Sequence, residues 1–335
     1  MYVVKMKDGF ESDKHLSSHM VDTERVYTST SFKGFAKTMD KETLTTLRNN
    51  PMVEYVKEDQ YYYLNNLDKR GFVAQSRTNY GIARVSHRNK GSSDYVYDPS
   101  AGAGTCIYMI DTGINIHHPD FHGRAVWGFN AIDSDDNDGL GHGTYTAGIA
   151  GSTTYGVAKQ ATLIAVKVFD HNGATAGHAI IDGVDWVGSD AMTRNCPRGV
   201  VANLSLGGGF DPAFNDAVAA LVNAGIFVAV SAGNDNTDAK DSSPGSEPSA
   251  PGSDIESTSH MGGSTISSGT SSSSPIVAGL GAYFLGLGSG ASGLCGRIKN
   301  LATRNVLSGV PEGTANFLAF NGATWSPRWR DGMSE

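Results

Sequence analysis

The spacing of apolar and polar residues divides the chain into two parts. In residues 1–66 the apolar clusters are short and are interrupted by Lys, Asp and Glu. Tyr2–Met6, Ser31–Lys37 and Val53–Val56 are typical of strands, and Lys41–Asn49 has its apolar residues in helical register. This part is predicted to be a small, separate α/β sandwich.

From Gly81 onward, short apolar runs alternate with helical stretches. The predicted strands are Cys106–Ile110, Thr162–Phe169, Val200–Leu206 and Ile226–Val230. The predicted helices are His142–Gly151, Ala179–Val187, Asn215–Asn223 and Pro275–Leu287. Alternating strands and helices predict an α/β fold, a parallel sheet flanked by helices on both faces, with the functional residues at the carboxyl ends of the strands.

The polar run between Gln60 and Tyr80 has no periodicity and contains the dibasic pair Lys69 and Arg70. It is predicted to be an exposed linker that proteases can reach. The predicted organisation is therefore a small unit at 1–66, a cleavable linker leading into the next domain at 67–80, and a large domain at 81–335.

Composition narrows the function classes. The 335 residues include 26 Lys and Arg against 34 Asp and Glu, a net charge of −8, which argues against a nucleic-acid partner or an anionic membrane surface. No run of 18 apolar residues predicts a transmembrane helix, and the first ten residues, MYVVKMKDGF, contain no signal-peptide core. The three cysteines leave one without an intramolecular partner.

Three segments place a reactive side chain where a predicted element starts or ends. Asp111 follows a strand in I-D-T-G, and it is either a turn residue or half of an aspartic-protease pair. No second D-T-G or D-S-G occurs, which argues against that class. His142 lies between glycines at a helix start, and Ser271 lies in a serine-rich loop before a helix N-terminus. Each residue alone is also compatible with a structural role.

The order Asp111, His142, Ser271 is one of the few in which a carboxylate, a base and a nucleophile occur together on α/β sheets. At these positions the chain resembles the subtilisin family of serine endopeptidases, in its proteinase K-like fungal branch. The matching segments are CIYMIDTGINIHHPDF, DGLGHGTYTAGIAGSTTYGVAK, ANLSLGGG, VAVSAGNDN and SGTSSSSPIVAGLGAYFL. The resemblance runs from about Ala74 to Phe320, and YVVKMKDG, FKGFA and VEYVKEDQ resemble the α+β, ferredoxin-like inhibitor propeptide of such enzymes.

The resemblance implies roles for individual residues. Asp111 corresponds to the triad carboxylate, His142 to the general base and Ser271 to the nucleophile. Asn234 corresponds to the oxyanion-hole residue, acting together with the backbone N–H of Ser271.

The resemblance also implies substrate contacts on two edges of a cleft. These residues are Gly173, Thr175, Gly177, Ser205, Leu206, Gly207, Gly208, Ser231 and Gly233. Gly177 stands where relatives often carry a bulkier residue, which predicts a more open pocket. The walls are small or apolar, so a broad preference for aliphatic or aromatic side chains is expected.

The chain departs from the family between Asn234 and Ser271, where it is shorter by roughly two dozen residues, with the gap near 250–256. The absent segment is expected to include a core strand and a calcium ligand. Either the deletion is genuine and weakens or abolishes activity, or an exon is missing from the chain.

Smaller departures lie beside the expected catalytic residues. Ser272 and Ser273 replace apolar residues, and their hydroxyls need partners. Tyr145 and Thr146 replace the usual His and Val or Cys.

The resemblance gives the cysteines a reading as well. Cys106 and Cys196 stand where relatives form a disulfide, and the partner of Cys295 would lie in the absent segment.

Two other sequence patterns carry less weight as functional sites. His117, His118, Asp120 and His122 suggest a metal site, but this stretch is structural in the family, and the metal assignment stays open. The letters G-x-G-x-x-G from Gly288 to Gly293 follow a helix rather than a strand, which argues against a dinucleotide site.

The leading hypothesis is a secreted, monomeric serine endopeptidase zymogen. It would act on proteins or peptides, be inhibited by its own propeptide, and be cleaved between Arg70 and Ala74. No cofactor is expected for the chemistry, whereas structural calcium is expected from the family. The alternative is a catalytically impaired homologue that acts as a binding or inhibitory protein.

Overall fold

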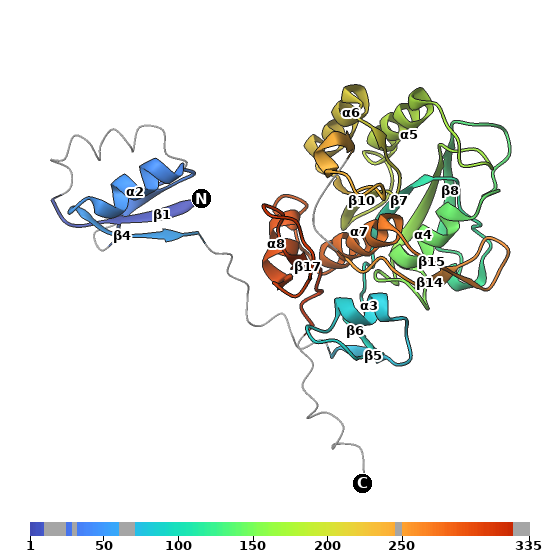
Figure 1. The fold of residues 1–335 in the computed structure, drawn as a ribbon, viewed down its shortest axis with the longest axis horizontal. Coiled ribbons are helices and arrows are strands. Elements are labelled where there is room, and N and C mark those ends of the chain that lie inside the picture. Colours follow the sequence, from blue (N-terminus) through green and yellow to red (C-terminus); the bar gives the residue numbers. More distant parts are fainter. Residues whose placement is uncertain (10–24, 29–31, 60–70, 245–249, 324–335) are drawn as a thin grey trace, which may run out of the picture. The chain divides into compact units, whose positions relative to one another are not determined.

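The computed structural model describes residues 1–9, 25–28, 32–59, 71–244 and 250–323 (Figure 1). The chain divides into two compact units, Met1–Leu67 and Asp68–Glu335. Within the described residues, no helix combines the length and the apolar character needed to cross a membrane.

The N-terminal unit is an antiparallel sheet with strand order β2-β3-β1-β4 and one helix. Its elements are β1 (Tyr2–Met6), β2 (Arg25–Thr28), β3 (Lys33–Lys37), α2 (Lys41–Asn49) and β4 (Val53–Glu58). Val4, Phe35 and Leu47 form the centre of its small core. This α+β arrangement confirms the predicted fold class, although β2 was not predicted because its side chains are mostly exposed and show no alternation.

The larger unit is built on five parallel strands in the order β12-β10-β7-β9-β8. The strands are β7 (Thr105–Asp111), β8 (Ala125–Asn130), β9 (Thr162–Lys167), β10 (Gly199–Leu204) and β12 (Phe227–Val230). Helices α4 (His142–Gly151) and α7 (Thr270–Gly286) cover one face, and α5 (Gly177–Asp190) and α6 (Pro212–Asn223) cover the other (Figure 1). The predicted parallel sheet flanked by helices is confirmed.

Both faces of the central strand β7 are buried. Ile107 and Met109 pack in the core beneath α4 and α7, whereas Tyr108 and Ile110 pack in the core beneath α5 and α6. A strand buried on both faces needs apolar residues at every position, which explains the continuous apolar run that predicted it.

Shorter elements complete the larger unit. They are β5 (Val73–Gln75), α3 (Tyr80–Val85), β6 (Tyr95–Tyr97), η2 (Pro119–Phe121), β11 (Gly208–Gly209), η3 (Ala239–Asp241), β13 (Ser242–Ser243), β14 (Ile255–Thr258), β15 (Ser264–Ser267), α8 (Leu294–Leu301), β16 (Thr303–Arg304) and β17 (Phe317–Leu318).

The C-terminal part of the predicted linker is structured. Strand β5 pairs with β6, and Asn79 caps α3 by accepting a hydrogen bond from the Ile82 N–H. Pairing with β6 therefore orders a segment that has no periodicity of its own, and its residues up to Tyr80 are exposed or half-buried, whereas its cleavage stays a prediction. Residues 60–70 of that linker lie outside the described residues.

Strand β12 lies at one edge of the parallel sheet. It borders a groove of about 1320 Å³, whose other walls include Val277 of α7 and the free Cys295 of α8. An edge strand beside a groove is what the expected loss of a neighbouring core strand would produce, and Cys295 lies on the same groove.

The predicted disulfide between Cys106 and Cys196 is present and joins the start of β7 to the segment before β10. We expect Cys196→Ser to lower the free energy of unfolding by about 4.5 kcal/mol, because the bridge closes a loop of 90 residues in the unfolded chain. Denaturant unfolding measures this difference. Cys295→Ser is the matched control and should leave the unfolding midpoint unchanged; equal midpoints for both variants would contradict the prediction.

Candidate active site

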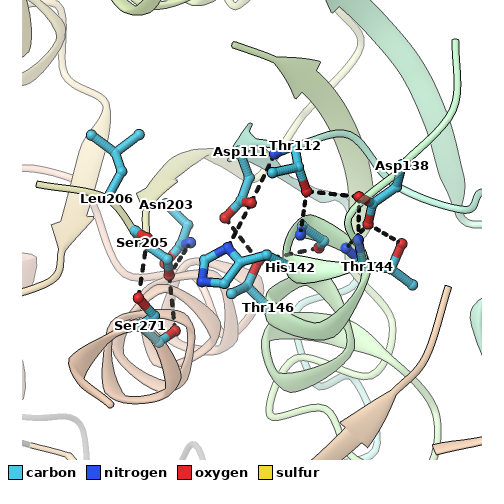
Figure 2. Close-up of polar contacts among 12 residues, drawn as sticks. Asp111, Thr112, Asp138, His142, Thr144, Thr146, Asn203, Ser205, Leu206 and Ser271 are labelled. Carbon is cyan, nitrogen blue, oxygen red and sulfur yellow. Dashed lines mark hydrogen bonds and ion pairs between the residues drawn. The ribbon is translucent and has the colours of Figure 1, made fainter. Parts of the chain in front are cut away.

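Asp111 is the last residue of β7, in the middle of the sheet, and only 2% of it is exposed. Its Oδ1 lies 2.7 Å from Nδ1 of His142 and accepts the Thr112 N–H at 2.8 Å (Figure 2). The Thr146 hydroxyl lies 3.3 Å from Oδ2. A buried carboxylate stays ionised only when such partners replace water.

His142 is the first residue of α4, and a second buried carboxylate organises this helix start. Asp138 accepts the N–H groups of Gly141 and Thr144 at 2.7 and 2.8 Å (Figure 2). It also accepts the hydroxyls of Thr112 and Thr144 at 2.7 and 2.6 Å. These bonds satisfy N–H groups that a helix leaves without partners in its first turn, and a negative charge is favourable there.

The sequence reasoning did not include Asp138. The available signal was an acidic residue a few positions before a predicted helix start.

The charge of Asp111 raises the pKa of His142 from 6.5 to about 8, against the opposing effect of burial, and Asp138 adds a smaller contribution. Because Nδ1 faces the Asp111 carboxylate, the single N–H proton of the neutral imidazole is on Nδ1. Nε2 is then the nitrogen that can accept a proton from another group.

Ser271 is the second residue of α7 and follows Gly269, whose φ of +143° favours glycine. Its hydroxyl donates to the backbone oxygen of Ser205 at 3.2 Å, and the Ser205 hydroxyl donates to the backbone oxygen of Ser271 at 2.9 Å (Figure 2). Pro275 has no N–H to offer that same Ser271 oxygen, so the Ser205 hydroxyl takes the place of a helical bond.

Helix α7 begins at Thr270, so the predicted start at Pro275 was wrong by more than one turn. Among the hydrogen bonds of the described residues, none joins Ser271 to His142. Both residues line one cleft of about 570 Å³.

Most of the predicted substrate contacts lie on this cleft: Gly173, Ser205, Leu206, Gly207, Gly208, Ser231 and Gly233. Thr175 and Gly177 are not among its lining residues, and Gly177 is the first residue of α5. The cleft wall also contains residues that the sequence did not identify as substrate contacts, among them Leu140 and Phe169.

Asn234 lines the same cleft, close to the start of α7. Its Oδ1 accepts the N–H of Thr270 at 2.9 Å and the Thr270 hydroxyl at 3.1 Å. The oxygen end of the carboxamide is therefore held by the residue next to Ser271.

The serine hydroxyls after Ser271 have the partners that the sequence analysis required. Ser272 Oγ lies 2.8 Å from the Tyr145 hydroxyl, and Ser273 Oγ donates to the backbone oxygen of Ala250 at 2.9 Å. Ser274 Oγ donates to Asn203 Oδ1 at 2.8 Å.

No three His, Cys, Asp or Glu side chains of the described residues converge on a point that could hold a metal ion. In the stretch considered as a metal site, Nε2 of His118 faces the Gly263 oxygen at 2.9 Å, and Asp120 accepts hydrogen bonds from Thr154. Structural calcium stays a prediction from the resemblance.

Known protein families and relatives match both units of the chain. The profile of the Subtilase family matches residues 102–253, and that of Peptidase inhibitor I9 matches residues 1–65. The cuticle-degrading protease of Metarhizium anisopliae is 44% identical, with 96% of this chain and 89% of that protein covered. The alkaline serine protease ver112 of Corniculantispora psalliotae is also 44% identical, with 96% and 90% covered.

A solved structure, described as a cold adapted subtilisin-like serine proteinase, superposes with a TM-score of 0.69 at 34% identity. The match covers 74% of this chain and 100% of that one.

The His142–Asp111 pair predicts a pH dependence. We expect His142 to titrate with a pKa of about 8, and Asp111→Asn to lower that pKa to 6.5 or below, because burial remains while the opposing charge is lost. The pair's contribution to stability is then fully present below pH 6.5 and is lost as the pH rises through about 8.

Imidazole NMR titration measures this pKa. Asp136→Asn, which alters an exposed carboxylate of the preceding loop, is the control and should leave the pKa in place. A His142 pKa that does not respond to Asp111→Asn would contradict the assignment.

Proposed function

The chain belongs to the subtilase family, and we propose that it is a serine endopeptidase made as a zymogen, with Asp111, His142 and Ser271 as its catalytic triad. The observation that carries the proposal is the 2.7 Å contact between His142 and the buried Asp111, on a cleft that Ser271 also lines. This is the arrangement of orienting carboxylate, base and nucleophile that acyl transfer requires.

In the proposed reaction, the Ser271 hydroxyl turns from the Ser205 oxygen toward His142. Nε2 of His142 takes the hydroxyl proton while Ser271 Oγ bonds to the substrate carbonyl carbon. When the resulting tetrahedral adduct collapses, His142 gives the proton to the departing amine and an acyl-enzyme is left. Water then attacks the ester carbonyl carbon while His142 takes one of its protons. Collapse of this second adduct breaks the bond to Ser271 Oγ, which regains the proton from His142, and the acid is released. Asp111 stays ionised and stabilises the imidazolium throughout.

The developing oxyanion would be stabilised by two donors. Since Oδ1 of Asn234 is engaged with Thr270, Nδ2 is the end of the carboxamide available to a substrate. The N–H of Ser271, in the first turn of α7, has no acceptor four residues earlier within the helix. Both groups would strengthen their hydrogen bonds as charge builds on the carbonyl oxygen.

An extended protein or peptide substrate would lie between Gly173 and the Ser205–Gly208 segment and form main-chain hydrogen bonds with them. The small and apolar wall, including Leu206, favours a broad preference for aliphatic or aromatic side chains.

Residues 1–66, which contain the I9 inhibitor match, would occupy the cleft until the chain is cut. A cut between Arg70 and Ala74, on the N-terminal side of Gln75, would leave the new N-terminus anchored, because Gln75 pairs in β5 and its side chain donates to the Thr154 oxygen at 2.9 Å.

We propose that the protein acts outside the cell as a monomer. Structural calcium is proposed from the family resemblance alone.

The second candidate, an impaired homologue with a binding or inhibitory role, rests on the shortened segment. The alignment with the Metarhizium anisopliae protease spans 353 positions, whereas 96% of this chain is about 322 residues, so about 31 positions have no counterpart here. The groove beside β12 agrees with a lost strand.

We favour the active enzyme over the impaired homologue, because residues next to the suspected gap still form hydrogen bonds with the start of α7. The Gly252 oxygen accepts the Gly269 N–H at 2.7 Å, and the Ala250 oxygen accepts the Ser273 hydroxyl.

A fluorophosphonate probe separates the two candidates. Ser271 Oγ should bond to the phosphorus as fluoride leaves and the hydroxyl proton passes to His142, which adds the probe mass less that of HF to Ser271 in the folded, propeptide-free protein. Ser271→Ala should abolish labelling, and His142→Ala should slow it by at least about a thousandfold, because the nucleophile loses its base. Absence of labelling in the folded parental protein would reject the enzyme and favour the impaired homologue.

Asn234→Ala should lower kcat about 10²- to 10³-fold with little change in KM, because the lost donor acts mainly in the transition state. Hydrolysis of a peptide substrate measures both constants. Asn236→Gly changes an exposed asparagine two residues later, whose φ of +54° glycine also adopts; it is the control and should hydrolyse the substrate at the parental rate. An equal loss in both variants would assign the effect to the loop rather than to the Asn234 amide.

A further inference from the structure

A buried tyrosine hydroxyl links the helix of the proposed base to the helix of the proposed nucleophile. Tyr145 lies one turn after His142 in α4 and is 4% exposed. Its hydroxyl is 2.8 Å from Oγ of Ser272, the residue that follows Ser271. Building on the proposed function, we propose that Tyr145 and Ser272 form a positioning pair that holds the Ser271 hydroxyl at the distance from His142 that proton transfer requires.

The same hydroxyl contacts both strands of the β14–β15 hairpin. It lies 3.0 Å from the Ile255 oxygen and 3.2 Å from the Ser267 oxygen. A phenol has one proton to donate and two lone pairs. All three contacts are satisfied when Ser272 donates to Tyr145 and the single phenol proton is shared between the Ile255 and Ser267 oxygens. Ser272 is 1% exposed, so when the hydroxyl of Tyr145 or of Ser272 is removed, water does not take its place as hydrogen-bond partner of the remaining hydroxyl.

The hairpin and α4 form one rigid support. Ser257 and Thr258 of β14 donate their hydroxyls to the backbone oxygens of Tyr145 and Thr144, both at 2.8 Å. At Gly148 the two elements touch so closely that an added Cβ would lie 2.2 Å from the Thr258 hydroxyl. The start of α7 is thus attached through Tyr145 to a support that also carries His142.

Ser271 is therefore held from two sides. On one side Ser205, after β10, exchanges two hydrogen bonds with Ser271. On the other side Tyr145 holds its neighbour Ser272. Loss of the second attachment removes the link between the start of α7 and α4. The bonds to Ser205 remain, and they draw the hydroxyl toward the Ser205 oxygen rather than toward His142.

Burial also raises the pKa of Tyr145, so the phenol keeps its proton at the pH values where His142 titrates. The Tyr145 contact therefore does not itself change over that range. The pH dependence of the reaction should therefore not arise from Tyr145.

The test compares Tyr145→Phe, Ser272→Ala and the double variant, each in the folded, propeptide-free protein, by the second-order rate constant of fluorophosphonate labelling. Each single variant should label about tenfold more slowly, because small misplacement of a reacting group is costly. The double variant should be no slower than the single ones, because the two groups act as one unit.

The midpoint of the pH dependence should stay near 8 in every variant, since the Asp111–His142 pair is untouched. Labelling of each variant should still go to completion. A variant that had merely lost folded protein would show a lower final extent of labelling instead.

Two control variants separate positioning from general destabilisation. Tyr108→Phe removes another buried tyrosine hydroxyl, one that bonds to Asp190 at 2.6 Å. Ser86→Ala removes a buried serine hydroxyl whose partners are the Ala83 oxygen of α3 and the Val96 N–H of β6. Both should label at the parental rate.

Four results would each overturn the inference. They are a parental labelling rate for Tyr145→Phe, single effects that multiply to about a hundredfold in the double variant, an equal fall of the rate in the controls, and a shifted midpoint of the pH dependence. In those cases the parental protein still labels, so the proposed function stands. A parental protein that does not label at all would overturn the proposed function and the inference with it.

Discussion

The ionised carboxylate of Asp111, buried at the end of the central strand, is the constraint on which the candidate active site depends. A charge that is 2% exposed is stable only if its neighbours replace water, and these neighbours are the Thr112 N–H, the Thr146 hydroxyl and His142. The same burial strengthens the attraction between Asp111 and His142, which is why the pKa of the imidazole lies above its ordinary value.

This constraint requires α4 to approach the end of β7 very closely. A Cβ added to Gly143 would lie 2.1 Å from the Gly113 oxygen, so only glycine lets the helix begin there. Asp138 then satisfies the first N–H groups of α4. The position of His142 thus follows from a close backbone contact and a helix cap, and not from the histidine itself.

The departures from the family fall into two physical groups. At the predicted gap, the edge strand β12 is only partly buried and borders a groove. The polar residues at 272 and 273 are instead matched by partners within the fold, Tyr145 and the Ala250 oxygen. A buried hydroxyl that is paired in this way no longer argues against an ordered nucleophile helix.

The sequence by itself determined the elements that form an uninterrupted run of apolar or small residues, such as β7 and α4, and the order Asp111, His142, Ser271 along the chain. It did not predict β8, because Gly128 and a register shift interrupt its apolar pattern and its side chains are only partly buried. Only the tertiary structure decided which residues line the cleft, leaving Thr175 and Gly177 outside it.

Only the tertiary structure, likewise, paired Tyr145 with Ser272, 127 positions apart. The reason is that a local pattern reports whether a side chain is buried, whereas the partner of a buried polar group is set by how distant helices and strands pack against one another.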